Sequence, residues 1–408
     1  MNIKLIKRGG PELQEVVIVS AVRTPLGNIG GTLKDITPQE LGGLIVKEAV
    51  ARAGVSPDLV EGAIMGWSRQ TTEAANIARV CSLLAGITED ASAYTVHCQC
   101  AASLKAISNG TQEIQTGRSA VIVAGGTESL SRAPFYLKNA RYGYGAGDGV
   151  LVDSLTEAGP GGQPSSIYGS VSMGDTAENV AEKYNVSRED QDKFAFQSQE
   201  RCQRSLASGV FKDEILPIEI KTRKGTVIFD TDEGPRASTL EKLASLKPVF
   251  KKGGSVTAGN SCGRNDAAAA VVLMSAEKAK ELGIKPLARI VTDAAVGVPP
   301  QIMGIGPIPA VRKALKQAGL SLADIDLIEL NEAFASQSLA VIRELGLDME
   351  KTNVNGGAIG LGHPIGATGA RLMTTLLYEL RRRNGRYGMV TLCIGGGQGM
   401  ATIIEALY

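Results

Sequence analysis

The chain has 408 residues, more than one hydrophobic core usually organises, so we expect two or three domains. Its 43 basic and 42 acidic side chains nearly cancel, which excludes the basic surface typical of a nucleic-acid-binding protein. There is no apolar run of about 18 residues and no signal-peptide pattern, so we expect no membrane contact and a cytoplasmic location. The six cysteines form no compact framework, which favours reduced thiols.

The first elements alternate between buried strands and helices. Residues 15–21 form an apolar, β-branched run typical of a buried strand, and a helix capped by Thr37 follows and ends near Gly54. Further strands are predicted over 60–65, 94–96 and 120–124, the last ending in Gly125 and Gly126. This order is typical of an α/β protein.

The second half repeats this plan. A strand is predicted over 288–296 and a helix over 308–318, and "AGLSLADIDLIELN" after that helix echoes "AGVSPDLVEGAIMG" in the first half. Gly54 precedes Cys100 by 46 positions and Gly319 precedes His363 by 44. The repeat therefore places Cys100 and His363 at equivalent strand-to-helix turns, with two similar halves facing each other.

Residues 130–263 differ in composition from both halves. Residues 141–174 are rich in Gly, Tyr, Pro and Ser and are predicted to form a long ordered loop. Ser187 is expected to cap a helix in which Cys202 is core filler, and 212–220 and 227–229 alternate like strands.

Two thiols and a histidine, His97, Cys98 and Cys100, lie where a strand runs into a helix with Leu104 on its apolar face. The N–H groups of a helix start favour a thiolate, the form of cysteine that acts as a nucleophile. Taken alone, however, a free cysteine is more often a small buried hydrophobe, and a Cys-x-Cys pair with a histidine is also compatible with metal binding.

Three further stretches carry polar groups at predicted strand ends. His363 lies among glycines in "GGAIGLGHPIGATGAR", before a helix with a buried leucine stripe. Cys393 ends a strand in "CIGGGQG", where Gly395 offers an unobstructed N–H donor. Asn331 either caps the following helix, which its local sequence favours, or orients a water molecule. A nucleophilic thiol, a base, a second thiol and amide donors together suit acyl transfer to a carbon nucleophile.

The ordered motifs "VVIVSAVRTP", "VIVAGGTESLSRAP", "MGDTAENVAEKY", "VTAGNSCGRNDAAA", "NEAF", "GGAIGLGHPIGATGAR" and "CIGGGQG" closely resemble those of the thiolase family over nearly the whole chain. The resemblance implies the five-layered αβαβα thiolase fold, with two pseudo-symmetric βαβαβαββ halves and an inserted loop domain. Residues 1–14 would then be an N-terminal extension, 15–129 with 264–285 the first half, 130–263 the loop domain for CoA and oligomer contacts, and 286–408 the second half. A homodimer or homotetramer is expected.

By this resemblance Cys100 accepts the acyl group, His363 activates it and Cys393 moves the proton of the α-carbon or of the leaving thiol. Asn331 and His363 would form one oxyanion hole through a water molecule, and the N–H groups of Cys100 and Gly395 the other. No metal or cofactor is implied, because acetyl-CoA, acetoacetyl-CoA and CoA are substrates. The implied CoA contacts are Met173, Arg236, Phe250, Ala258, Cys262, Gly263, Met303, Ala333 and Phe334.

Several positions depart from the usual family pattern. His97 and Cys98 add polar groups to the cysteine loop, Ser172 stands where acetoacetyl-CoA-specific members commonly have histidine, and Cys262 stands where serine is usual. Arg264 adds a positive charge beside the CoA segment. The resemblance favours an acetyl-CoA C-acetyltransferase. Its alternatives are a degradative 3-ketoacyl-CoA thiolase of broader chain length and a non-catalytic, lipid-carrier-like relative, while the second cysteine argues against a decarboxylating ketoacyl synthase.

Overall fold

The computed structural model describes residues 13–223 and 225–408. Residues 1–12 of the predicted N-terminal extension lie outside the described residues. A ten-stranded sheet runs through the molecule, and the pairing of β1 with β11 joins its two parts through Val17–Arg289 and Ile18–Ala288. Each part belongs to one half of the chain, as the internal repeat predicts.

The first part of the sheet has the strand order β4-β3-β5-β10-β1. Strand β3 is parallel to β4 and β5, whereas β10 is antiparallel to β5 and β1. The predicted strands are present, and the bounds are β1 (Val16–Arg23), β2 (Gly27–Asn28), β3 (Gly62–Gly66), β4 (Ser92–Val96), β5 (Val121–Ser129) and β10 (Asn265–Ser275).

Strand β5 is longer than predicted, because Gly125 and Gly126 continue it instead of ending it. Both glycines pair with β10. A Cβ on Gly126 would lie 2.2 Å from the Gly366 carbonyl oxygen, and one on Gly125 would lie 2.3 Å from the Ala269 oxygen. The two glycines therefore allow close approach between backbones and do not mark a turn.

The second part of the sheet has the order β12-β13-β14-β11, with β12 parallel to β13 and the other pairs antiparallel. On the other side of β12, the segment that contains Thr352 runs parallel to it and forms a single bridge, between Ile328 and Thr352. The bounds are β11 (Ala288–Gly297), β12 (Leu327–Leu330), β13 (Tyr387–Ile394) and β14 (Gln398–Ala406).

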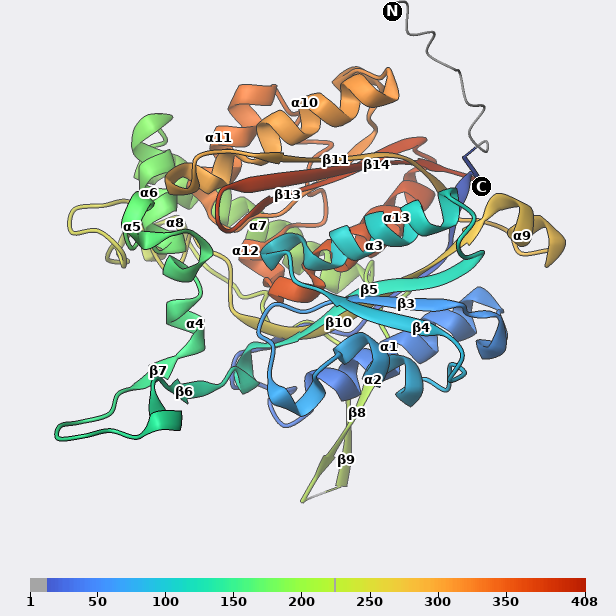
Figure 1. Cartoon of the computed structure of the whole chain (residues 1–408). Helices are drawn as coiled ribbons and strands as arrows, with labels where there is room; N and C mark the ends of the chain where they lie inside the picture. Colours follow the sequence, from blue (N-terminus) through green and yellow to red (C-terminus); the bar gives the residue numbers. More distant parts are fainter. Residues whose placement is uncertain (1–12, 224) are drawn as a thin grey trace, which may run out of the picture.

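Helices cover both outer faces of the sheet parts and fill the space between them, which confirms the five-layered αβαβα architecture (Figure 1). In Figure 1, α1 and α2 lie below, α3 and α13 lie in the middle, and α10 and α11 lie on top. The bounds are α1 (Pro38–Ala53), α2 (Ile77–Leu84), α3 (Ala102–Gln115), α10 (Pro307–Ala318), α11 (Ala335–Leu345) and α13 (Thr368–Arg383).

The repeat is visible in the backbone. Helices α1 and α10 end at Gly54 and Gly319, whose φ angles are +65° and +66°, a left-handed conformation that suits glycine. Each helix is followed by a short 3₁₀ turn and then by β3 or β12. Cys100 consequently lies in the turn before α3, and His363 lies in the turn before α13.

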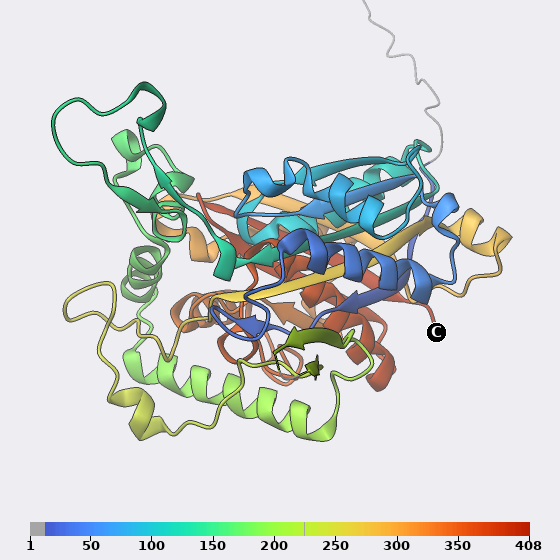
Figure 2. The same cartoon turned by 90° about the horizontal axis from the view of Figure 1, so that it is seen from below.

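The segment between the halves covers one side of the molecule (Figure 2), and the hairpins β6–β7 and β8–β9 project from it in Figure 1. Residues 141–174 are less irregular than predicted, because they contain β7, α4 and α5. Strand β8 begins later than predicted, at Ile218. The bounds in this segment are β6 (Phe135–Leu137), β7 (Leu151–Asp153), α4 (Ser154–Glu157), α5 (Ser165–Tyr168), α6 (Met173–Lys183), α7 (Arg188–Ser208), β8 (Ile218–Thr222), β9 (Gly225–Phe229) and α8 (Leu240–Ala244). Two short helices lie outside it, α9 (Ala276–Glu281) and α12 (Ala358–Leu361).

Local capping follows the predicted chemistry. Thr37 accepts a hydrogen bond from the Glu40 N–H at the start of α1, and Ser187 accepts one from the Asp190 N–H at the start of α7. Cys202 is fully buried in α7 and packs as core filler. No helix within residues 13–223 or 225–408 is long and apolar enough to cross a bilayer.

Candidate active site

Cys100 lies in the 3₁₀ turn over Gln99–Ala101 that leads into α3. The backbone N–H of Gly395, which follows β13, favours the ionised sulfur and lowers the pKa of the thiol. Burial nevertheless raises the pKa of the Cys100 thiol to about 11, although the Gly395 N–H and the charge of Arg69 oppose that rise. The helix start alone therefore does not ionise the sulfur, and the thiol is protonated at neutral pH in the unliganded protein.

His363 presents one free ring nitrogen inside the protein. The Thr368 hydroxyl donates to the Pro364 carbonyl at 2.9 Å, so its oxygen accepts from Nδ1–H of His363, 2.7 Å away. This arrangement makes Nε2 the unprotonated nitrogen, and Nε2 is buried without a partner. Burial, followed by the charges of Arg371 and Arg69, lowers the pKa of His363 to about 3. The imidazole is thus neutral and able to accept a proton.

Cys393 lies near the end of β13 and is fully buried. Burial raises the pKa of its thiol well above the ordinary value, and the neighbouring thiols of Cys100 and Cys262 raise it further. The two strand-to-helix turns and the end of β13 therefore bring together Cys100 and Cys393, which are far apart in the chain. Cys393 packs against apolar side chains from several elements, namely Met173, Ala177, Val256, Met303, Ala333 and Phe334.

Asn331 does not cap α11, so the interpretation favoured by its local sequence is wrong. Helix α11 begins at Ala335 and Phe334 is its N-cap residue. The backbone N–H of Asn331 donates to the Thr391 carbonyl at 3.0 Å, beside β13. Both polar atoms of its buried side-chain amide lack a partner. Buried polar groups are normally satisfied, so this amide is available to a water molecule or a substrate.

A cavity of about 340 Å³ contains the thiol of Cys100 and the ring of His363 in its wall. Gly395 lines it too, whereas Cys393 and Asn331 are not among its lining residues. The sequence did not single out Arg69, Gln99, Leu130, Leu155 and Ile365, which also line this cavity. Arg69 follows the end of the predicted strand at 60–65 by four positions, and this spacing gave no signal that its side chain reaches the cavity. Of the expected CoA contacts, the cavity wall includes Met173, Phe250, Cys262, Gly263, Met303, Ala333 and Phe334.

The other two expected CoA contacts, Arg236 and Ala258, line a second cavity of about 240 Å³. The two cavities share Cys262 and Arg264 among their lining residues. A long ligand could therefore run past residues 261–264 from one cavity into the other.

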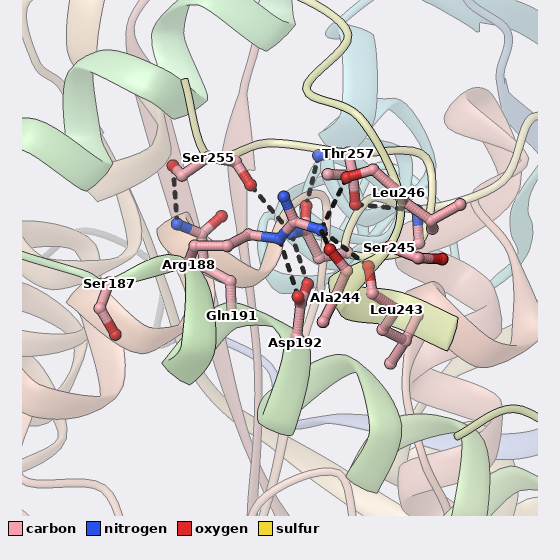
Figure 3. A network of polar contacts seen from close by, with 12 residues as sticks. Ser187, Arg188, Gln191, Asp192, Leu243, Ala244, Ser245, Leu246, Ser255 and Thr257 are labelled. Carbon is pink, nitrogen blue, oxygen red and sulfur yellow. Dashed lines mark hydrogen bonds and ion pairs between the residues drawn. The ribbon is translucent and has the colours of Figure 1, made fainter. Parts of the chain in front are cut away.

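The segment that carries Cys262 is tied to neighbouring elements on both sides. Its N–H donates to the Ala333 carbonyl at 3.1 Å, and the Asn260 carbonyl accepts from the Ala335 N–H at 2.9 Å. Figure 3 shows the support behind it, where Arg188 of α7 bonds to Asp192 at 2.7 Å and to carbonyls at the end of α8. Asp192 in turn accepts from the Asn260 amide at 3.0 Å. This network holds α7, α8 and the 255–260 segment together.

A buried glutamate fixes the histidine turn against the first half. Glu128 accepts backbone N–H groups from Ser68 and Arg69 at 3.1 Å each, and from Gly366 at 2.8 Å. Gly366 follows His363 by three positions, so Glu128 links the turn after β3 to the turn before α13.

The N-terminal domain model of thiolases matches residues 16–277, and the C-terminal domain model of thiolases matches residues 284–406. The chain belongs to the thiolase family. This membership confirms the family predicted from the motifs, and the fold described above is the thiolase fold.

The thiolase has full-length relatives in several bacteria. It is 52% identical to an acetyl-CoA acetyltransferase of Syntrophomonas wolfei, over 97% of this chain and 100% of the relative. It is 49% identical to the beta-ketothiolase BktB of Cupriavidus necator, with the same coverage of both chains.

Solved thiolase structures match it closely. The crystal structure of a Bacillus anthracis acetyl-CoA acetyltransferase superposes with a TM-score of 0.94 at 49% identity, covering 97% of this chain and 100% of the other. A human mitochondrial 3-ketoacyl-CoA thiolase in complex with CoA superposes with a TM-score of 0.93 at 45% identity, covering 98% and 100% of the two chains.

Some departures of this thiolase from the family pattern have a structural explanation. Ser172 lines the cavity and caps α6, because its hydroxyl oxygen accepts from the Asp175 N–H at 3.2 Å and its proton goes to the Asp175 carboxylate at 2.7 Å. His97 is exposed, and Cys98 is partly buried beside the helix layer that contains α3. Within the described residues, no group of three or more His, Cys, Asp or Glu side chains is arranged to hold a metal ion.

The raised pKa of Cys100 predicts how this thiolase reacts with iodoacetamide. The reactive species is the thiolate, so below the thiol pKa its fraction grows about tenfold per pH unit. Because the Cys100 pKa is about 11, we expect the rate of alkylation in the unliganded protein to rise without a plateau between about pH 7 and pH 9.5. Peptide mapping on a Cys98→Ala background isolates the Cys100 signal. A plateau near the ordinary thiol pKa of about 8.5 would contradict the burial argument.

Proposed function

We propose that this thiolase transfers acetyl groups between coenzyme A thioesters, joining two molecules of acetyl-CoA into acetoacetyl-CoA and CoA and catalysing the reverse cleavage. The observation that carries the proposal is the shared cavity. Its wall includes Cys100, the backbone of Gly395 and a neutral histidine whose free ring nitrogen is buried without a partner. Such an arrangement suits covalent acyl transfer through a cysteine.

In the first half-reaction, Nε2 of His363 takes the proton of Cys100 while the sulfur attacks the carbonyl carbon of acetyl-CoA. The negative charge that develops on the carbonyl oxygen is stabilised by N–H groups of the Cys100 and Gly395 backbone. When the tetrahedral intermediate collapses, the C–S bond to CoA breaks and the leaving thiolate takes the proton of the Cys393 thiol, so that Cys393 becomes a thiolate while His363 keeps the Cys100 proton on Nε2. The products are acetyl-Cys100 and free CoA.

In the second half-reaction, Cys393 removes a proton from the α-carbon of another acetyl-CoA. The resulting enolate oxygen accepts hydrogen bonds from His363 and from a water molecule held by the unpartnered Asn331 amide. The α-carbon attacks acetyl-Cys100, forming a C–C bond and releasing the Cys100 thiolate. Acetoacetyl-CoA leaves, His363 returns its proton to the Cys100 thiolate, and Cys393 keeps the α-proton as its thiol proton, which restores the starting state of the site.

We further propose that residues 130–263 form the loop domain that binds CoA. In this arrangement the pantetheine arm passes Met173, Cys262 and Phe334, while Arg236 and Arg264 face the phosphates. The support is that the two cavities share residues 261–264 and that Arg264 is exposed where they meet. Phe250 and Phe334 form an edge-to-face pair with ring centroids 6.2 Å apart, which gives the arm a rigid apolar wall.

A 3-ketoacyl-CoA thiolase that acts on longer chains is a second candidate, favoured by the apolar side chains of Leu130, Leu155 and Ile365 in the cavity. The charged side chain of Arg69 in the same wall opposes it, because an uncharged chain reaching Arg69 would desolvate the guanidinium without replacing its hydrogen bonds. A non-catalytic lipid carrier is disfavoured, because such a protein does not need a buried histidine with a free ring nitrogen in the same cavity wall as a thiol.

The rate of CoA-dependent cleavage tests the chain-length preference. We expect kcat/KM for acetoacetyl-CoA to exceed that for 3-oxodecanoyl-CoA by about tenfold or more, the discrimination that about 1.4 kcal/mol of lost binding produces. A higher value for the longer substrate would instead assign the protein to the degradative class. Absence of cleavage with both substrates would refute the proposed activity.

We also propose that the protein is a cytoplasmic homodimer or homotetramer. The hairpin of β6 and β7 exposes Phe135, Tyr136 and Leu151, and α5 exposes Ile167 at 72%. Exposed large apolar side chains in such number are more typical of a subunit contact than of a monomer surface. Light scattering that gives the monomer mass at micromolar concentration would contradict the oligomer.

A further inference from the structure

The side chain of Arg69 reaches the catalytic cavity from the turn after β3. Its Nη1 bonds to the Ser68 carbonyl at 3.2 Å and lies 3.5 Å from the Gln99 amide oxygen, next to Cys100 in the chain. Its Nε is buried without a partner. Since a guanidinium carries five N–H donors, most of this group's hydrogen-bonding capacity is unused.

No carboxylate in the described parts of the chain forms an ion pair with Arg69. The nearest candidate is Glu128, but its two oxygens already accept backbone N–H groups from Ser68, Arg69 and Gly366. A partly buried guanidinium without an anionic partner lowers the stability of the folded protein, because the free energy of desolvating the charge is not offset by a charge-assisted hydrogen bond. Such a group is therefore suited to an anion that arrives with the substrate.

The position of Arg69 shows which part of the substrate it would meet. Its charge acts on Cys100 and on His363, lowering the pKa of each, so it lies at the reacting end of the cavity. The second cavity, which Arg236 lines and Arg69 does not, lies on the side assigned to CoA. The phosphates of CoA are separated from its sulfur by the whole pantetheine arm, so they do not account for Arg69.

We propose that Arg69 binds a carboxylate at the far end of the acyl chain carried by Cys100, so that the substrates include short 3-oxoacyl-CoA thioesters with a terminal carboxylate. This inference rests on the proposed acyl transfer and names a substrate class for the same site. Leu130, Leu155 and Ile365 cover the methylene groups, and the free N–H donors of Arg69 hold the carboxylate.

The chemical steps are those of thiolytic cleavage. The Cys100 sulfur attacks the 3-oxo carbon, the bond between C2 and C3 breaks, and C2 takes a proton from Cys393 to leave as acetyl-CoA. The chain that stays on Cys100 ends in the carboxylate. The sulfur of a CoA molecule, whose thiol proton passes to the Cys393 thiolate, then attacks the thioester and releases the carboxylated acyl-CoA, and His363 returns to the Cys100 sulfur the proton that it took in the first step.

Three substrates and two variants test the inference. The substrates are acetoacetyl-CoA, 3-oxohexanoyl-CoA and 3-oxohexanedioyl-CoA, the last two differing only in the terminal carboxylate. We expect the wild-type kcat/KM for 3-oxohexanedioyl-CoA to exceed that for 3-oxohexanoyl-CoA by at least about tenfold, because hydrogen bonds to charged groups strengthen binding by that factor or more. Arg69→Met should remove this preference while lowering acetoacetyl-CoA cleavage by a smaller factor, and Arg69→Lys should restore part of it. Lys47→Met, which removes an exposed charge on α1, should leave the preference unchanged.

Equal wild-type rates for the two six-carbon substrates, or a preference that survives in Arg69→Met, would overturn the inference. If Arg69→Met does not fold, the wild-type preference still decides it, and that preference should weaken as salt is added. Absence of acetoacetyl-CoA cleavage in the wild type would instead count against the proposed acetyl transfer. The two failures are therefore distinguishable.

Discussion

Replacing His363 with alanine should lower kcat/KM for acetoacetyl-CoA cleavage by about 10²- to 10⁴-fold, the range that general acid–base catalysis contributes. The Cys100 thiol is protonated at neutral pH, so a base must remove its proton before the sulfur can attack. Stopped-flow measurement of CoA release from acetyl-CoA isolates this first step. The step should slow to the same extent as the overall rate.

His97→Ala is the matched control, since it removes the other histidine, whose ring is exposed. This variant should keep the wild-type rate within about twofold, as surface substitutions usually do. A second variant, Thr368→Val, removes the acceptor of the Nδ1–H bond and should show a smaller loss than His363→Ala. Wild-type turnover by a folded His363→Ala protein would exclude this histidine as the base.

For Cys393→Ala we expect the two half-reactions to separate. Acetyl transfer from acetyl-CoA to Cys100 should persist, because Cys100, His363 and the Gly395 N–H remain in place. Condensation should fall by about 10²- to 10⁴-fold, because the variant lacks the thiol that takes the α-proton. Rapid-quench detection of acetyl-enzyme, together with a spectroscopic assay of acetoacetyl-CoA, measures the two steps separately.

Cys98→Ala provides the control for removing a thiol near the site, and its condensation rate should stay close to wild type. A Cys393→Ala variant that condenses normally would contradict the proton-transfer role. Loss of both half-reactions in a folded variant would indicate that Cys393 supports the position of Cys100 and does not act on the α-proton itself.

Much of the fold could be predicted because its signals are local. The apolar run at 15–21, the Thr37 cap and the glycine at 54 act within a few residues, and the structure contains the strand, the cap and the helix end that they predict. The repeat extended these local signals to the second half. Gly125 and Gly126 were misread as a strand end because their partners, Ala269 and Gly366, come from distant segments.

The site could be predicted only in part. Family motifs indicated Cys100, His363 and Cys393, and the structure brings these three together. The environment of each group depends on tertiary packing, however. Burial outweighs the helix start at Cys100, and Asn331 is left without partners although its local sequence favours a cap. Arg69 was overlooked because nothing near it in the chain shows that it reaches the cavity.

The most direct test of the account is the identity of the acylated residue. The protein is mixed briefly with acetyl-CoA, quenched in acid and digested, and the peptides that contain Cys98 and Cys100 are fragmented by mass spectrometry. We predict a mass gain of one acetyl group on Cys100 and none on Cys98. An acetyl group found only on Cys98, or absent from both thiols while acetoacetyl-CoA is still turned over, would contradict the account.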